Sequence, residues 1–377
     1  MRQTTANRPG RPAVLMPVMG ALAASVALPF AFAQTAQQGP LQALHDEREV
    51  RLTNVRQITT LGGYAEAYWS NDGKRIICQA RRGDMKADQM FVMNADGSNE
   101  RMVSNGAGRC TCGFFLKGDR EILYSSTCGF HPEPPAPPER SQGYVWPVWN
   151  SYAIYRARAD GSRARPIIPR RVVAGQKTAY YAEATVSADG KRVLFTSSMD
   201  GDLEIYSMKP DGTDVRRLTH RVGYDGGPVF SPDGSMIAWR AWYPQSAEER
   251  SEYLSLLARE LVRPSRMEIW VARSDGTNPR QITKLGGASF APYFTPDGKS
   301  VVFSSNHHDA AGRKFDLFMI HLDGTGLEQV THGGEFDCFP MFSRDGKRLV
   351  WCSNRNGPSR HTDVFVADWV STRASGQ

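Results

Sequence analysis

Imidazole, carboxylate and amide side chains stand together in one short polar run of this chain, Asn306-His307-His308-Asp309. Histidine beside carboxylates can exchange protons near neutral pH or bind a divalent cation. His308 with Asp309 and the later Asp337 is therefore a candidate acid–base or cation site. The alternative is that His307 and His308 are solvated loop residues. The full candidate ligand-binding set is Asn306, His307, His308, Asp309, Asp337, Asn354, Arg355 and Asp225.

Nucleophilic chemistry has little support in the sequence. There is no G-x-S-x-G motif, the turn that exposes the nucleophile of an α/β-type serine hydrolase. The run Cys110-Thr111-Cys112 is a weak metal motif, because no second Cys or His pair stands at a ligand spacing. We therefore expect a protein that is not an enzyme and that holds no cofactor, with a bound divalent cation as the alternative.

Two longer segments are candidates for partner binding. The first, residues 131–150, is rich in proline, which favours an extended and stiff chain. Its aromatic residues either pack on neighbouring strands or form an aromatic lip for a sugar, peptide or protein.

The second segment, residues 243–265, predicts a helix that begins at the capping residue Ser246. Tyr253, Leu257 and Leu261 fall on one helical face. Such a helix either packs sideways on a β framework or acts as a lid or docking arm. The candidate partner-binding residues of the two segments are Tyr144, Trp146, Trp149, Tyr253 and Leu257.

The framework that must position these residues repeats along the chain. Residues 290–334 contain four short β-type runs, FAPYF, SVVFSS, FDLFMI and LEQVT, with Asp-Gly turns between strands. Such units recur six times, at a spacing of about 44 to 48 residues where no insert intervenes, which is the length of a propeller blade. Glycine takes the positive φ of a hairpin turn and aspartate bonds its own backbone, so we interpret these pairs as turn residues rather than calcium ligands.

The first and last units complement each other. The last lacks a fourth strand, and the chain start carries a lone copy of one, VRQITTLGG, from Val55. Pairing the two would close the ring and remove two exposed sheet edges. The sequence therefore predicts an all-β, six-bladed β-propeller over residues 53–370, closed by an N-terminal strand and with one helical insert in blade four. Acids that open the third strand of four units are expected to form hydrogen bonds within the blade; they are Glu204, Glu268, Asp316 and Asp363.

The repeat pattern resembles the propeller repeats of the TolB family, the periplasmic component of the Tol system, and of prolyl oligopeptidase family propellers. The resemblance is carried by Phe230–Gly234, Ser353–Arg355, Asp363–Phe365 and Arg216–Thr219. It implies a propeller fold and a periplasmic compartment. It does not extend to the α/β domain that precedes the propeller in TolB, because about 20 residues separate the expected cleavage site from the first strand.

Residues 1–33 have the features of a signal peptide. A basic start is followed by the apolar, acid-free stretch 13–32 and by the cleavage signal Ala31-Phe32-Ala33. A membrane anchor is the alternative, although the apolar stretch is short and contains proline. We expect residues 34–52 to be a linker, residues 371–377 to be a tail, and no transmembrane segment after cleavage.

The charge and the cysteine content narrow the range of possible functions further. Removing the leader takes away three Arg and no acid, which lowers the formal net charge from +7 to +4. The basic residues look scattered, so we do not expect nucleic-acid binding. In an exported protein Cys110, Cys112 and Cys128 are disulfide candidates. Cys338 and Cys352 flank a turn, but a regular register would place them on opposite faces of the sheet.

These observations together predict a monomeric periplasmic or secreted protein. Its expected role is non-catalytic: a binding or scaffold module for a protein or cell-envelope partner at the mouth of the propeller channel. The alternative is a carbohydrate-active propeller enzyme, a lyase or hydrolase that uses His and acidic residues and a metal ion.

Overall fold

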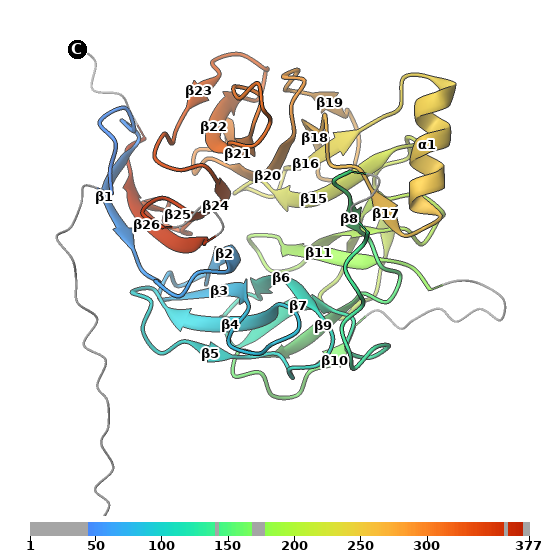
Figure 1. Ribbon diagram of the computed structural model, residues 1–377, viewed down its shortest axis with the longest axis horizontal. Helices are drawn as coiled ribbons and strands as arrows, with labels where there is room; N and C mark the ends of the chain where they lie inside the picture. Colours follow the sequence, from blue (N-terminus) through green and yellow to red (C-terminus); the bar gives the residue numbers. More distant parts are fainter. Residues whose placement is uncertain (1–43, 140–142, 168–177, 358–360, 372–377) are drawn as a thin grey trace, which may run out of the picture. The chain divides into compact units, whose positions relative to one another are not determined.

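The computed structural model describes residues 44–139, 143–167, 178–357 and 361–371 (Figure 1). The predicted signal peptide, most of the predicted linker and nearly all of the predicted tail lie outside these ranges. No helix within the described ranges has the length and apolar character needed to cross a bilayer.

Six four-stranded antiparallel sheets are arranged as the blades of a β-propeller, as the repeats predict (Figure 1). Blade one contains β2 (Tyr64–Trp69), β3 (Arg75–Ala80), β4 (Gln89–Asn94) and β5 (Arg101–Met102). Blade two contains β6 (Cys110–Phe115), β7 (Glu121–Ser126), β9 (Ala153–Arg158) and β10 (Arg165–Pro166). Blade three contains β11 (Tyr181–Val186), β12 (Val193–Ser197), β13 (Glu204–Met208) and β14 (Arg216–Arg217).

The remaining blades follow the same order from the inner to the outer strand. Blade four contains β15 (Tyr224–Phe230), β16 (Met236–Trp242), β18 (Glu268–Arg273) and β19 (Arg280–Gln281). Blade five contains β20 (Ser289–Phe294), β21 (Ser300–Ser305), β22 (Asp316–His321) and β23 (Glu328–Gln329). Blade six contains β24 (Asp337–Phe342), β25 (Arg348–Ser353), β26 (Asp363–Trp369) and β1 (Leu52–Gln57).

Blade six joins the two ends of the described chain. β1 pairs antiparallel with β26, from Leu52 opposite Trp369 to Gln57 opposite Phe365. A buried ion-pair group reinforces this join, because Arg355 Nη2 lies 2.9 Å from Glu49 Oε1 and 2.9 Å from Asp337 Oδ2. The N-terminal strand thus supplies the fourth strand that the last repeat lacks.

The turns confirm the predicted role of the Asp-Gly pairs. In blade four the Asp233 carboxylate accepts a hydrogen bond of 2.6 Å from Ser231 Oγ and one of 3.0 Å from the Ser235 amide. Gly234 follows at φ +74°, a conformation that glycine adopts without strain.

The acids that open the third strands bond within their own blade, as predicted. Glu268 accepts from Thr283 Oγ1 at 2.5 Å and from the Leu285 amide at 2.8 Å. Asp363 accepts from Thr59 Oγ1 at 2.9 Å across the join to β1. These carboxylates therefore tie the outer strand to the loop that leads to the next blade.

The apolar core lies between neighbouring blades. Trp69 and Ile76 of blade one pack in one cluster with Met341 and Val350 of blade six. Blades three and four share a similar cluster that includes Leu194 and Trp239. Because each sheet is covered by its neighbours, its inner strands are largely buried, whereas short outer strands such as β5 and β10 are exposed.

All six cysteines are free thiols, so the bridge predicted among Cys110, Cys112 and Cys128 is not formed in this structure. The register expected for Cys338 and Cys352 is wrong. A β-bulge between Cys338 and Met341 shifts the pairing by a residue, and Cys338 then lies directly opposite Cys352.

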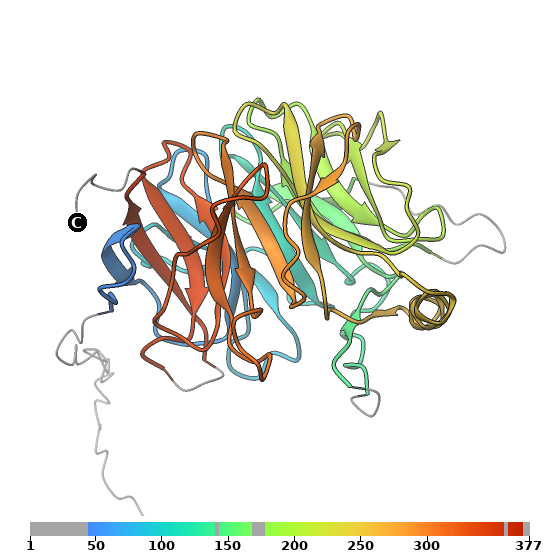
Figure 2. The same cartoon turned by 90° about the horizontal axis from the view of Figure 1, so that it is seen from above.

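The two inserts contact each other at one end of the ring (Figure 2). β8 (Trp146–Pro147) of the first insert pairs with β17 (Leu261–Val262) of the second in a two-stranded sheet. Helix α1 (Ala247–Leu257) begins at Ser246, whose Oγ accepts a hydrogen bond from the Glu249 amide, as the capping residue predicts. Tyr253 anchors the helix, because its hydroxyl donates to Gly223 O at 2.6 Å and lies 2.5 Å from Asp202 Oδ1.

Candidate functional site: a hollow at the channel mouth

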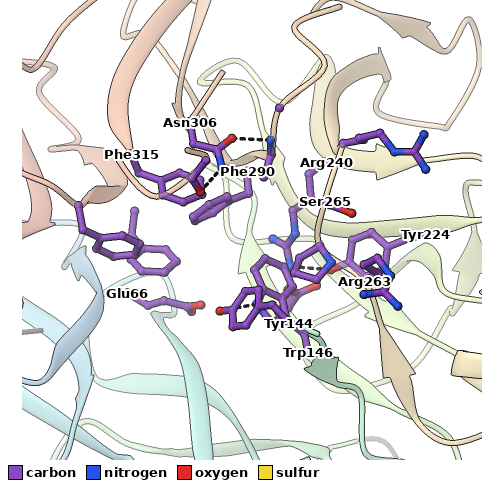
Figure 3. A pocket seen from close by; sticks show the side chains of 18 of the residues that line it. Glu66, Tyr144, Trp146, Tyr224, Arg240, Arg263, Ser265, Phe290, Asn306 and Phe315 are labelled. Atoms are coloured by element: carbon purple, nitrogen blue, oxygen red, sulfur yellow. Dashed lines mark hydrogen bonds and ion pairs between the residues drawn. The ribbon is translucent and has the colours of Figure 1, made fainter. Parts of the chain in front are cut away.

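A hollow of about 1060 Å³ lies at the end of the channel that carries the two inserts (Figure 3). Its rim contains the insert residue Tyr144 and the loop residues Asn306, His307 and Asp309. Its walls are formed by inner-strand residues of several blades. The loops that precede first strands and those that follow second strands gather here, as the propeller topology requires.

A ring of β-bulges surrounds the channel below this hollow. In every blade the pairing of the inner strand with the second strand shifts register once near its third or fourth residue. At each shift one residue has positive φ, and these six residues line a narrower space of about 50 Å³. We call them the collar: Glu66, Cys112, Glu183, Gly227, Ala291 and Phe339.

The collar conformation is costly for most of these residues. Non-glycine residues in the left-handed region cost about 1–2 kcal/mol each. An added Cβ at Gly227 would collide with Nη1 of Arg240, so a larger residue there would displace that guanidinium. Strained backbone of this kind concentrates at binding and catalytic sites, where it aims particular side chains.

The charged wall of the hollow is built around Arg240, on β16. Its guanidinium is ion-paired with the Glu183 carboxylate and donates to the Tyr224 hydroxyl at 2.7 Å. The guanidinium carbon also lies 5.3 Å from the centroid of the Trp146 ring, within the range of a cation–π contact.

Glu183 is fully engaged. Besides the ion pair with Arg240, its Oε2 accepts hydrogen bonds from Thr196 Oγ1 at 2.6 Å and from the Gly227 amide at 2.8 Å. These contacts join blades three and four at the collar. They hold the carboxylate in place and leave it little capacity to bind another cation.

Glu66 of the collar stands in a different environment. Burial raises the pKa of its carboxyl group to about 7, and the nearby negative charge of Glu183 adds to the effect. The Cys112 thiol is its hydrogen-bonding neighbour. No described residue forms an ion pair with Glu66, whereas Arg109 at the rim is paired with Asp88, at 3.4 Å. Glu66 is therefore a polar group on the wall that can receive a ligand.

The rest of the wall is aromatic and meets the charged wall at Trp146. Phe290 lies at ring-centroid distances of 5.1 Å from Phe315, 5.9 Å from Phe339 and 5.9 Å from Trp146. Phe336 continues the group, 5.7 Å from Phe315. Figure 3 shows Phe290 and Phe315 on one side of the hollow and Tyr144 and Trp146 on another. We call this set, Trp146, Phe290, Phe315, Phe336 and Phe339, the aromatic wall.

The predicted ligand-binding residues fall into two groups. Asn306, His307 and Asp309 line the hollow. His308 is turned toward blade five, with Nε2 at 2.8 Å from Asp316 Oδ2. Burial raises the pKa of Asp316 to about 7.

The other four predicted residues are buried and bonded within the protein. Asp337 and Arg355 belong to the ion-pair group of blade six. The Asn354 side-chain oxygen accepts from the Phe336 amide at 2.9 Å, and Asp225 accepts from Trp239 Nε1 at 2.6 Å. They support the loops of the hollow without lining it.

The predicted partner-binding residues lie partly at the rim and partly in the protein interior. Tyr144 is 68% exposed at the rim and its hydroxyl accepts a hydrogen bond from Trp146 Nε1. Trp149 stacks on Tyr152, with ring centroids 6.0 Å apart. Tyr253 lies on the buried face of helix α1, and Leu257 of the same helix is partly buried.

The sequence did not single out Arg240 or the collar residues other than Cys112, which it named only as a disulfide candidate. One signal was available. Blades one and three share the run Tyr-Ala-Glu-Ala at the same place in their inner strands, residues 64–67 and 181–184, and its glutamates are Glu66 and Glu183. For metal binding, the described ranges contain no group of three His, Cys, Asp or Glu side chains arranged to hold an ion.

Partial relatives with different names match segments of this chain. An uncharacterised protein of Agrobacterium fabrum is 31% identical over 131 residues, which is 35% of this chain and 38% of that protein. A TolB homologue of Chlorobium luteolum is 27% identical over 143 residues, 32% of each chain. Dipeptidyl-peptidase 5 of Porphyromonas endodontalis is 25% identical over 142 residues, 31% of this chain and 20% of that enzyme. The match thus spans between 20% and 38% of each of these relatives, and no protein-family model matches the chain.

Solved structures share the fold. A TolB candidate of Agrobacterium tumefaciens superposes with a TM-score of 0.53 at 20% identity, over 84% of this chain and 94% of that one. This similarity supports the propeller architecture. With the matches to TolB sequences, it places the repeats among those of TolB-like propellers.

Proposed function

We propose that this TolB-like propeller repeat protein is a non-catalytic binding module of the cell envelope, and that its hollow at the channel mouth receives a segment of a protein partner. The observation that carries the proposal is the juxtaposition of the aromatic wall with the Glu66 carboxyl across a hollow of about 1060 Å³. That volume is at the upper end for small-molecule sites, which span about 300–1000 Å³, and suits a short peptide segment.

The chemistry of the walls suggests which segment would fit. Aromatic anchors packed in a concave site contribute most of the affinity in protein interfaces. The segment should therefore present an apolar or aromatic side chain to Phe290 and Phe315. A hydroxyl or cationic group on the same segment would face Glu66, which has no ion-pair partner among the described residues.

The charged groups of the hollow favour a binding role over a catalytic role. Arg240 is occupied by Glu183, and Arg109 by Asp88. Such pairs fix the shape of a site and leave little reactive charge. The expected location in the periplasm, or outside the cell, rests on the predicted signal peptide and on the similarity to TolB proteins.

A second candidate, a carbohydrate-active enzyme, is favoured by one observation. Glu66 and Glu183 are two carboxyl groups of the same collar in unlike surroundings, and burial raises the pKa of Glu66 to about 7. Pairs of acids whose environments differ in this way serve as general acid and base in glycoside chemistry. The aromatic wall would then stack on sugar rings.

A photo-crosslinking amino acid at position 315 tests the binding proposal. The full chain carrying it should crosslink to a discrete protein in a cell-envelope extract, and the same label at Leu327, which is 42% exposed in the loop between β22 and β23, should not. Equal labelling from both positions, or none from 315, would contradict the proposal. Cleavage of envelope oligosaccharides that is lost in Glu66→Gln would establish the enzyme instead.

A further inference from the structure

A second hollow, of about 380 Å³, lies on blade two and is lined almost entirely by arginine. Its residues sit beside the turns at Gly118 and Gly161, which join first to second and third to fourth strands. This is the end of the blade opposite the channel mouth. The lining residues are Arg120, Glu121, Arg156, Arg158, Arg163 and Arg165, and we call this set the arginine hollow.

The strand register explains why these side chains gather. Arg165 on β10 lies directly opposite Arg156 on β9, and Arg158 on β9 lies opposite Glu121 on β7. Residues two apart on a strand share a face, so these four side chains stand on the same side of the sheet. Like charges directly opposite each other destabilise a sheet unless something compensates them.

One arginine of the hollow forms an ion pair with a described residue. Arg156 is ion-paired with Glu121, its Nε lying 2.9 Å from Glu121 Oε1, and its Nη1 donates to Pro210 O of blade three at 3.2 Å. The pKa of Glu121 is lowered, first by its hydrogen bond to Arg156 and also by the charges of Arg165 and Arg158. A strong positive potential therefore acts on this one carboxylate.

The other four arginines have no ion-pair partner among the described residues. Arg120, Arg158, Arg163 and Arg165 are exposed, and none of them forms an ion pair with a described residue. The turn acid Asp160 accepts a hydrogen bond of 2.7 Å from Ser162 Oγ, which lowers its pKa together with the charge of Arg158, but it forms no ion pair with a described arginine of the hollow. The sequence predicts that basic residues are scattered. That prediction is wrong for blade two, where arginines cluster.

A neighbouring basic hollow on the same end of the propeller provides a contrast. It is larger, about 980 Å³, and lies at blades three and four. Two of its arginines, Arg192 and Arg216, share the Asp214 carboxylate at 2.7 and 3.0 Å. Its charges are largely neutralised within the protein, whereas those of the arginine hollow are not.

We propose that the arginine hollow binds a phosphate group with two or more negative charges, either free or on a lipid headgroup. The planar guanidinium fork matches phosphate oxygens in pairs, and charge-assisted hydrogen bonds of this type are strong. Four guanidinium groups without an ion pair among the described residues match a multiply charged anion. A hollow of about 380 Å³ admits a headgroup or a small phosphate compound rather than a folded partner.

The test uses the full chain and three probes: pyrophosphate, phosphatidylcholine vesicles containing phosphatidic acid, and phosphatidylcholine vesicles containing oleic acid as a carboxylate control. Calorimetry measures the first and co-sedimentation the other two. The variant Arg158→Gln/Arg165→Gln removes two unpaired charges and keeps most of each side chain. The matched control, Lys209→Gln/Arg216→Gln, removes two charges from the neighbouring hollow.

Binding of pyrophosphate or of phosphatidic acid vesicles that weakens at least about tenfold in Arg158→Gln/Arg165→Gln, and less than about twofold in the control, supports the proposal. Pyrophosphate binding alone identifies a free phosphate compound as the ligand, and vesicle binding identifies a lipid headgroup. Equal binding of the oleic acid vesicles, equal losses in both double variants, or no binding of any phosphate probe would overturn it. This outcome is independent of the channel-mouth site, because neither double variant alters a residue that lines it.

Discussion

Arg240 and Glu183 form an ion pair across two blades of the propeller, with side chains only 10% and 11% exposed. Arg240 comes from the second strand of blade four, and Glu183 from the inner strand of blade three at a bulge of positive φ. The pair therefore links the collar to the wall of the hollow. It also fixes Arg240 between the rings of Trp146 and Tyr224.

Removing one partner of this pair should be costly. Arg240→Met leaves the Glu183 carboxylate buried without a cation, and the free energy of unfolding should fall by about 3–5 kcal/mol. Chemical denaturation measures it. Arg216→Met breaks a pair with an arginine that is 67% exposed, and its effect should stay below about 1 kcal/mol. Similar losses in the two variants would show that the buried pair has no special structural role.

Glu66 should make stability depend on pH. Its pKa is raised from an ordinary 4.5 to about 7, so between these values the folded protein binds a proton that the unfolded chain has released. The contribution of this group to stability is therefore complete below about pH 4.5 and is lost as the pH rises to about 7.

The variant Glu66→Gln keeps a neutral side chain at every pH. Relative to the natural protein it should gain stability on the order of 2–3 kcal/mol as the pH rises through this window, with no further change above it. Comparing urea denaturation of the two proteins at several pH values isolates the effect from other titrating groups. A difference between them that does not vary with pH would mean that Glu66 stays ionised in the folded state.

The collar backbone should also respond to glycine. Ala291 has φ +51°, where glycine is free of the penalty that a Cβ incurs. Ala291→Gly is therefore expected to raise the free energy of unfolding by up to about 1 kcal/mol, since the relief of strain exceeds the entropy that glycine loses. Ala182→Gly, at an inner-strand position without positive φ, should lower it by about 0.5–1 kcal/mol or more. If Ala291→Gly destabilises as much as Ala182→Gly does, the bulge is not strained.

Local signals were enough to predict the fold. Turn pairs such as Asp233-Gly234 act through their own backbone, so their meaning does not depend on distant residues. Their repetition determines the number of blades. The unmatched strand at Val55 predicts the pairing of β1 with β26 because only one edge lacked a partner.

The site was less predictable because it depends on contacts between blades. Nothing in the residue type of Glu66 or Glu183 indicates a left-handed backbone, and the pair of Arg240 with Glu183 joins residues 57 positions apart. The same bulges shifted the register of Cys338 and Cys352. Polar loop residues were a better guide at the rim, where Asn306, His307 and Asp309 do line the hollow.

The most direct test of the central claim is the affinity of the crosslinked partner, once purified, for variants of the rim. Tyr144 is 68% exposed, so Tyr144→Ala should leave the fold intact while it removes an aromatic contact from the mouth of the hollow. If the hollow is the binding site, binding should weaken at least about tenfold in Tyr144→Ala and stay unchanged in Leu327→Ala. Natural affinity in Tyr144→Ala, or an equal loss in Leu327→Ala, would contradict the assignment of the channel mouth as the binding site.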